Sequence, residues 1–110
     1  MALDLFSLKG KVALVTGGSR GIGKMIAEGF LDQGAKVYIS SRKHSVCDEV
    51  AAELSVDGKQ CISLPQDVST LEGVQMLAKR LTELEPKLDI LVNNAGAGPV
   101  DGLIGLRASA

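Results

Sequence analysis

A short apolar run, a glycine-rich turn and an amphipathic segment follow one another without a break over residues 11–33. The run KVALVT (11–16) is short, rich in β-branched residues and flanked by glycine on both sides, which predicts a buried strand. The turn TGGSRGIGK (16–24) leads directly into a segment of helical spacing. Because a strand, a tight turn and a helix in this order form the first part of a parallel crossover, the succession favours an α/β fold.

The first predicted helix spans residues 19–33. Its apolar residues recur every four positions, which predicts one buried stripe made of Ile22, Ile26 and Phe30, with Met25 beside them. Gly34 follows directly, and glycine there accepts the left-handed conformation that ends many helices.

The same alternation continues to residue 93. Further strands are expected over 35–40, 61–64 and 88–93, and further helices over 44–57 and 69–85. Apolar positions mark the expected buried sides of these two helices: Val46, Val50 and Leu54 in the first, and Val74, Leu77, Leu81 and Leu84 in the second. Ser69 or Thr70 is expected to cap the last helix, with Glu72 in its first turn. The order β-α-β-α-β-α-β predicts parallel strands with helices on both faces, and the near-continuous apolar run LDILVN (88–93) predicts a strand buried on both faces.

Composition excludes several classes of protein. The chain has 110 residues, 45% of them hydrophobic, which is enough for one small domain with a core. A net charge of −1 without a basic cluster argues against binding to nucleic acid or to an anionic membrane surface. No segment resembles a signal peptide or approaches the length of a membrane span, so a cytoplasmic protein is expected. Cys47 and Cys61 form no CxxC motif, are expected to be small buried or half-buried thiols in a reducing compartment, and indicate no metal site.

A glycine-rich turn between a strand and a helix usually holds phosphate, and two kinds of ligand compete. Residues 18–24 match the G-x-x-x-x-G-K pattern of nucleoside-triphosphate sites. The next residue is Met25 rather than a serine or threonine that could hold Mg²⁺, and the strand over 88–93 leads into Asn93 and Asn94 rather than an aspartate. These departures disfavour a triphosphate.

The second candidate ligand is a dinucleotide. Gly17 can take a positive φ where the chain leaves the strand, and Gly21 and Gly23 carry no Cβ that would keep a pyrophosphate away from the backbone. The N-terminus of the helix adds free N–H groups and a partial positive charge. Glycine spacing alone also permits a turn that binds no ligand.

Three motifs together carry a family resemblance. TGGSRGIG (16–23), NNAG (93–96) and Asp67-Val68 after the third strand resemble the signatures of the short-chain dehydrogenase/reductase family. The resemblance covers residues 8–97 and, within the family, is nearest to NADPH-dependent 3-oxoacyl-carrier-protein reductases. It implies the N-terminal half of a Rossmann-type doubly wound parallel sheet, with the C-terminal half absent.

The resemblance also implies which residues contact a nicotinamide dinucleotide. The expected set is Gly17, Ser19, Arg20, Gly21 and Ile22 at the diphosphate and adenosine ribose, Asp67 and Val68 at the adenine, and Asn94, Ala95 and Gly96 along the nicotinamide-side ribose. Asn93 is expected to stabilise the central sheet through side-chain hydrogen bonds.

Charge favours NADP(H) over NAD(H). An NAD site needs a carboxylate about 20 residues past the turn to accept bonds from the ribose hydroxyls. The sequence there reads Ser40-Ser41-Arg42-Lys43. Since a 2′-phosphate prefers guanidinium partners, Arg42 and Arg20 are expected to hold it from two sides, with Ser41 donating a hydroxyl.

No catalytic residue is predicted. The family's catalytic serine and Tyr-x-x-x-Lys lie downstream of NNAG, whereas the single tyrosine here is Tyr38, expected in the sheet.

Residues 1–97 are expected to form a partial dinucleotide-binding domain and residues 98–110 a poorly ordered tail. We therefore expect the cofactor-binding portion of a carbonyl reductase, inactive as a truncated chain. Two alternatives stay open: a non-catalytic NADP-binding or subunit-interacting module that pairs with longer homologous chains through an exposed sheet edge, and a non-functional gene fragment.

Overall fold

Four parallel strands form one sheet in the order β3-β2-β1-β4. The computed structural model describes residues 7–94 of the chain. The strands are β1 (Val12–Thr16), β2 (Lys36–Ser40), β3 (Cys61–Ser63) and β4 (Ile90–Asn93). The predicted order β-α-β-α-β-α-β and the parallel sheet are confirmed.

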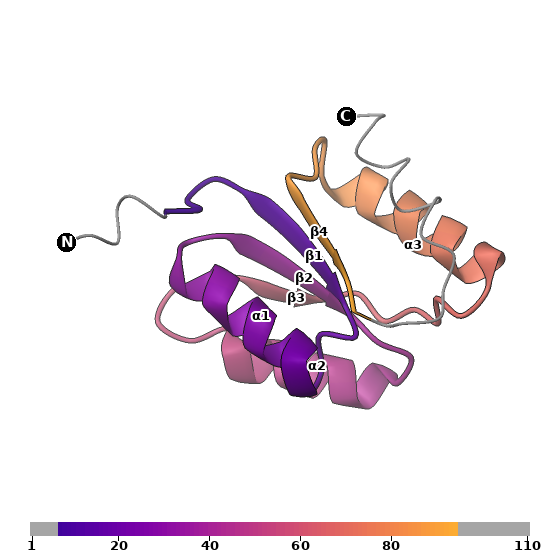
Figure 1. Cartoon of the computed structure of the whole chain (residues 1–110), viewed down its shortest axis with the longest axis horizontal. Helices are drawn as coiled ribbons and strands as arrows, with labels where there is room; N and C mark the ends of the chain where they lie inside the picture. Colours follow the sequence, from indigo (N-terminus) through magenta and orange to yellow (C-terminus); the bar gives the residue numbers. More distant parts are fainter. Residues whose placement is uncertain (1–6, 95–110) are drawn as a thin grey trace.

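Three helices cover the two faces of this sheet (Figure 1). They are α1 (Gly21–Asp32), α2 (His44–Leu54) and α3 (Leu71–Leu84). Figure 1 shows α1 and α2 side by side on one face and α3 on the other. This arrangement explains why β1 and β2 must be apolar on both sides.

The side chains of β1 and β2 alternate between two cores, as the two-residue period of a strand requires. Ala13 and Val15 of β1 lie in the core under α1 and α2, together with Val37 and Ile39 of β2. Leu14 and Tyr38 point the other way, into the core under α3, where Val74, Leu77 and Leu81 of that helix pack against them.

The buried side of α1 differs from the predicted stripe. The buried residues are Gly23, Ala27 and Leu31, whereas Ile22 and Met25 are 69% and 71% exposed. Ile26 and Phe30 are only partly buried. Small residues at positions 23 and 27 let the helix lie close to the sheet, so the face of contact is set by close approach rather than by the largest apolar side chains.

The other two helices also depart from prediction at their ends. Helix α2 ends at Leu54 rather than at 57, and the residues that follow include Asp57 and Gly58, which both have a positive φ (55° and 82°). Helix α3 has the predicted Thr70 cap, whose hydroxyl accepts the N–H of Gly73, and Glu72 lies in its first turn. Leu84 is 54% exposed, so its predicted burial is wrong.

Strands β3 and β4 form the two edges of the sheet in the described part of the chain. All four residues of β4 are partly buried, so the predicted burial on both faces is wrong for this outer position. At the opposite edge, the Ser55 hydroxyl accepts the Cys61 N–H at 3.0 Å and donates to the Cys61 carbonyl at 2.9 Å. Cys47 and Cys61 are buried free thiols, as predicted.

Candidate functional site

A cavity of about 480 Å³ opens at the carboxyl ends of the strands. The residues that line it come from the glycine turn, from the end of β2 and the start of α2, from the segment after β3, and from the residue after β4: Gly17, Ser19, Arg20, Ser40, Ser41, Arg42, Lys43, Val46, Gln66, Asp67, Val68, Ser69 and Asn94. Segments far apart in the sequence therefore share one site.

Strand register explains why these segments meet. Thr16, the last residue of β1, pairs with Ser40 of β2 on one side and with Asn93 of β4 on the other. After β1 the chain crosses to β2 and β3, and β4 then returns to the other side of β1. A ligand crevice in an open α/β sheet forms at such a reversal of strand order.

The glycine turn is held in a conformation that other residues would not adopt easily. Gly17 and Gly21 have φ values of 67° and 59°, in the left-handed region. A Cβ at position 23 would overlap the Gly17 carbonyl oxygen and crowd the Asn94 amide. The backbone of the turn therefore lies against the start of α1 with no room for a side chain between them.

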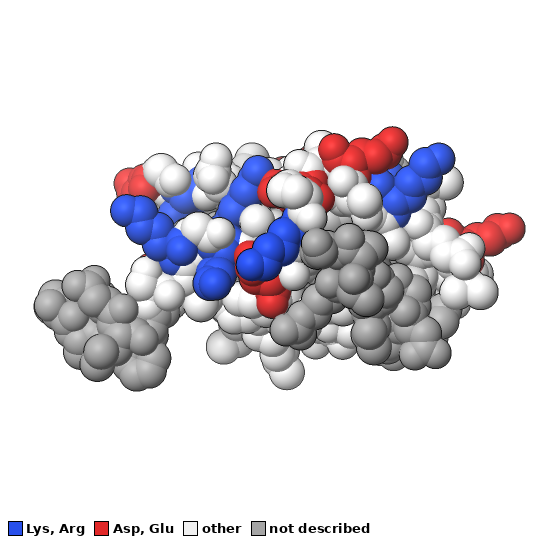
Figure 2. Space-filling model, turned by 90° about the horizontal axis from the view of Figure 1, so that it is seen from above, with Lys and Arg blue, Asp and Glu red and all other residues white. Residues whose placement is uncertain are grey.

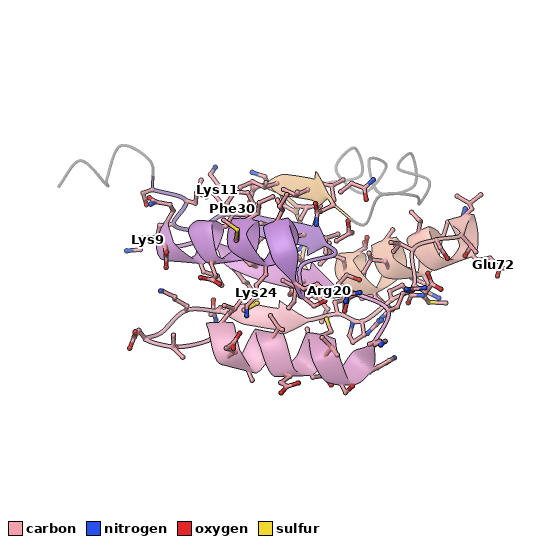
Figure 3. All side chains as sticks on the ribbon, turned by 60° about the horizontal axis from the view of Figure 1, so that its bottom comes forward. Lys9, Lys11, Arg20, Lys24, Phe30 and Glu72 are labelled. Atoms are coloured by element: carbon pink, nitrogen blue, oxygen red, sulfur yellow. The ribbon has the colours of Figure 1, made fainter. Side chains whose placement is uncertain are left out.

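The N-terminus of α1 faces this turn without a side-chain cap. Arg20 is the N-cap residue in an extended conformation (φ −163°), and the first turn of the helix carries no acidic residue. In the described residues no side chain accepts a hydrogen bond at this end, so its amide groups and the helix dipole favour an anion. Figure 3 shows Arg20 at the start of α1, on the side that faces α2.

The end of β2 supplies hydroxyl and guanidinium groups. The hydroxyls of Ser40 and Ser41 are buried and have no hydrogen-bond partner among the described residues. Both residues line the cavity, as do Arg42 and Lys43. Because a buried hydroxyl without a partner is energetically unfavourable, these two groups suit a polar ligand.

The wall opposite the glycine turn is the segment Gln66 to Ser69, which we call the 66–69 wall. Asp67 Oδ1 accepts the backbone N–H of Ser69 at 2.9 Å. This bond, a further one from the Ser69 side chain and the nearby charge of Arg42 lower the pKa of Asp67. The carboxyl is therefore ionised at neutral pH, and it accepts rather than donates hydrogen bonds.

The residue that follows β4, Asn94, forms the remaining side of the cavity. The Thr16 hydroxyl donates to Asn93 Oδ1 at 3.0 Å and accepts the Asn94 backbone N–H, also at 3.0 Å. The first bond bears out the predicted role of Asn93 in stabilising the sheet. Asn94 Nδ2 makes a long contact of 3.5 Å with the Gly17 carbonyl, so the residue after β4 lies against the glycine turn.

Most of the predicted dinucleotide contacts come together in this cavity. Its lining includes Gly17, Ser19, Arg20, Arg42, Asp67, Val68 and Asn94. Gly21 and Ile22 do not line it, since they lie in the first turn of α1 and the Ile22 side chain points into solvent. Ala95 and Gly96 lie outside the described residues. Arg20 and Arg42 line one cavity, as the NADP(H) prediction requires.

Several lining residues were not predicted as ligand contacts. They are Ser40, Lys43, Val46, Gln66 and Ser69. Val46 was assigned to a buried helix side, but it lies in the first turn of α2 beside the crevice. Gln66 and Ser69 flank the predicted pair Asp67-Val68, so a wider window around that motif would have included them.

Other kinds of site are not seen in residues 7–94. This part of the chain has no cluster of histidine, cysteine, aspartate or glutamate that could hold a metal ion. Nor does it contain a helix long and apolar enough to cross a membrane. Figure 2 shows a face on which basic and acidic side chains are interspersed rather than gathered in one basic patch.

Tyr38 has a structural position. It is 2% exposed, and its hydroxyl donates to Glu85 Oε2 at 2.6 Å. Burial, together with this bond to Glu85, raises the pKa of Tyr38 above its ordinary value. Tyr38 does not line the cavity, which agrees with its predicted place in the sheet.

Comparisons with known proteins agree with this geometry. The chain is 54% identical over 91 residues to a rhamnolipids biosynthesis 3-oxoacyl-[acyl-carrier-protein] reductase of Pseudomonas aeruginosa, covering 83% of this chain and 35% of that protein. A solved Pseudomonas aeruginosa RhlG/NADP active-site complex superposes with a TM-score of 0.80 at 51% identity, covering 92% of this chain and 40% of the other. L-sorbose reductase from Gluconobacter frateurii, solved with NADPH and L-sorbose, gives a TM-score of 0.77 at 39% identity over 84% of this chain and 36% of the other.

The chain thus spans little more than a third of the length of these relatives. A family model described as short chain dehydrogenase matches residues 11–107, which include the glycine turn, the 66–69 wall and the NNAG motif. The parallel sheet with its cavity at the strand ends, the family match and the relatives agree, and the chain belongs to the short chain dehydrogenase family.

Proposed function

We propose that the cavity binds NADP(H) in preference to NAD(H). The observation that carries the proposal is the pair of buried hydroxyls without partners, Ser40 and Ser41, in a cavity that Arg20 and Arg42 also line. Two guanidinium groups and two hydroxyl donors suit a phosphate dianion on the adenosine ribose. The solved relatives in complex with NADP and NADPH support this assignment.

The other parts of the dinucleotide are assigned to the other residues that line the cavity. The bare backbone at Gly17 and the uncapped start of α1 would hold the pyrophosphate, and Ser19 lies between them in sequence. Asp67 and Val68 would flank the adenine, since they line the opposite wall. Asn94, followed by Ala95 and Gly96, would lie along the nicotinamide-side ribose. We assign this binding to a domain of residues 1–97.

We propose that this chain is the dinucleotide-binding portion of an oxidoreductase that transfers a hydride between the nicotinamide and a carbonyl or alcohol substrate of the 3-oxoacyl type. The bound nicotinamide supplies or accepts the hydride, and the residues of this chain bind and orient the dinucleotide. The 3-oxoacyl-[acyl-carrier-protein] reductase at 54% identity supports this class of substrate. Tyr38 is committed to Glu85 and lies outside the cavity, so it cannot protonate a substrate oxygen.

Two measurements test the proposal. Fluorescence titration of the purified chain should give tighter binding of NADPH than of NADH, by at least about tenfold for a phosphate held by two arginines. Equal affinities, or no binding of either, would overturn it. A reductase assay with a 3-oxoacyl substrate should show no turnover by this chain alone, because Tyr38, its single tyrosine, lies outside the described cavity.

A second function, a non-catalytic NADP-binding module that associates with longer homologous chains, is supported by the outer position of β4. Its residues Leu91 and Val92 are only partly buried. Mixing this chain with a full-length homologue, followed by size-exclusion chromatography, tests it. Co-elution supports the module, and separate elution of both proteins contradicts it. The expected cytoplasmic location stays a prediction.

A further inference from the structure

We infer that Arg80, which does not line the cavity, is a positioning residue for the adenosine side of the dinucleotide site. The inference rests on the proposed NADP(H) function. Arg80 lies in α3, and its Nη1 donates a hydrogen bond to the Pro65 carbonyl at 2.6 Å. Pro65 immediately precedes the 66–69 wall, so this bond joins the helix to the start of that wall.

Backbone direction explains why the Pro65 carbonyl needs such a partner. Leu64 donates its N–H to Ile39 and Gln66 donates its N–H to Ser41, so both residues face β2. Because successive residues of an extended chain point to opposite sides, the carbonyl of Pro65 points away from β2. There it lies beyond the outer strand of the described sheet, and Arg80 provides a charge-assisted bond in place of a neighbouring strand.

The helix that carries Arg80 is itself firmly anchored. Val74, Leu77 and Leu81 of α3 are at most 1% exposed and pack in the core with Leu64 and Val68. Val68 belongs to the 66–69 wall, so the hydrophobic core under α3 also anchors the wall. Arg80 thus starts from a fixed backbone rather than from a flexible surface helix.

A second contact holds Asp67, within the wall, against the same helix. A Cβ at Gly73 would overlap the Asp67 carbonyl oxygen, so the first turn of α3 lies directly against the wall. Thr70 caps this turn through the Gly73 N–H. The wall is therefore fixed near Asp67 by close packing and at Pro65 by Arg80.

The position of the wall matters because it faces the phosphate side of the cavity. Gln66 bonds through its N–H to the carbonyl of Ser41, at 3.0 Å, and Ser41 directly precedes Arg42. Asp67 also lies near enough to Arg42 for their charges to interact. A shift of Pro65 would move the adenine contacts and the Ser41-Arg42 segment relative to each other, and so widen the site.

The test compares Arg80→Ala with Arg80→Lys and with the control Lys79→Ala. Lys79 is the exposed neighbour on α3, so its replacement removes the same charge from the same helix without touching the wall. Isothermal titration with 2′,5′-ADP, which contains only the adenosine half of NADP, should show about tenfold weaker binding for Arg80→Ala. Arg80→Lys should recover part of the affinity, and Lys79→Ala should bind like the unmodified chain.

Amide hydrogen exchange without ligand gives the independent readout. Arg80→Ala should accelerate exchange of the Gln66 amide, while the Leu14 and Val15 amides in β1 keep their rates. Unchanged affinity for 2′,5′-ADP, or equal acceleration in β1 and at Gln66, overturns the inference, since the second result means general destabilisation. If the unmodified chain binds neither NADPH nor 2′,5′-ADP, the proposed function fails and the ligand part of this inference fails with it. Exchange at Gln66 then still decides whether Arg80 holds the wall.

Discussion

The hydroxyl of Thr16, at the end of β1, accepts the backbone N–H of Asn94, which follows β4, at 3.0 Å. The same hydroxyl donates to Asn93 Oδ1, so one fully buried side chain joins the ends of the two strands on either side of the switch in strand order. Asn94 lines the cavity, and Thr16 directly precedes the glycine turn. Thr16 therefore couples the stability of the sheet to the shape of the site.

Replacing this hydroxyl should affect both properties. Thr16→Val keeps the volume but leaves the Asn94 N–H without its acceptor, so the free energy of unfolding should fall by about 1–2 kcal/mol. NADPH binding should weaken as well, because Asn94 loses its anchor. Thr16→Ser, which retains the hydroxyl, should lose less of both. Urea unfolding and fluorescence titration check this, and identical behaviour of the two variants would contradict it.

Gly23 should tolerate no side chain. Gly23→Ala places a methyl group against the Gly17 carbonyl oxygen, a backbone atom that cannot rotate away. We therefore expect the free energy of unfolding to fall by about 3 kcal/mol and NADPH binding to be lost. Gly29→Ala in the same helix is the matched control, since a Cβ there meets nothing within 4 Å. Higher helix propensity should make that control more stable by about 0.5–1 kcal/mol. Equal thermal transitions for the two variants would refute the role of Gly23.

Arg42 should decide between the two dinucleotides. Arg42→Ala should weaken NADPH binding about 10–100-fold through loss of a charge-assisted bond, and should change NADH binding little. Lys9→Ala is the control for charge, because Lys9 is exposed and does not line the cavity, and Figure 3 shows it toward the end of α1 opposite Arg20. A parallel loss of NADH and NADPH affinity would mean that Arg42 supports the fold of the cavity rather than the choice of ligand.

Glu85 should make stability depend on pH. Partial burial opposes its ionisation, but the bonds from Lys36 and Tyr38 outweigh that effect and lower the pKa of Glu85 in the folded chain. The Glu85 carboxylate is therefore protonated at higher pH in the unfolded chain than in the folded chain. Its contribution to the free energy of unfolding is fully present above the ordinary glutamate pKa of 4.5 and is lost as pH falls through the pKa of Glu85 in the folded chain. Glu85→Gln should remove that part of the acid dependence. Urea unfolding between pH 3 and pH 7, a window set around that value, measures it. A variant that keeps the full acid dependence would exclude Glu85 as its source.

The two cysteines should be unreactive in the folded chain. Burial, with a smaller contribution from Cys47, raises the pKa of Cys61 to about 12, so little thiolate forms at pH 8. Both thiols are also inaccessible. A colourimetric thiol reagent should therefore modify neither cysteine in the native chain and both in denaturant. Fast modification of the native chain would show that α2 opens from the sheet.

The repeated switch between strand and helix spacing was sufficient to predict the order of elements, because that order depends on local period and on glycine and proline positions. The same patterns could not give the buried face of α1. Ile22 and Met25 looked like core residues from their hydrophobicity, but the helix approaches the sheet on the side of Gly23 and Ala27. Close approach depends on small residues opposite another element, which a single periodicity does not reveal.

The parts of the candidate site that depend on residues adjacent in the sequence could be predicted. The parts that depend on contacts between residues far apart in the sequence could not. Glycines at the turn and Arg42 after β2 follow directly from motif spacing and charge. The bond between Arg80 and Pro65 crosses from one element to another, and no local pattern indicates it. The same holds for the buried hydroxyl of Ser40, which reads as an ordinary strand residue until the cavity beside it is seen.

The outer edge of β3 has one further consequence, for self-assembly. Its exposed backbone groups would otherwise offer a template to an incoming strand of another molecule. The Ser55 hydroxyl already occupies both groups of Cys61, Pro65 has no N–H to offer, and its carbonyl is taken by Arg80. A fibril that grew from this side would have to break these bonds first, so we expect solubility to fall in a variant that lacks Ser55.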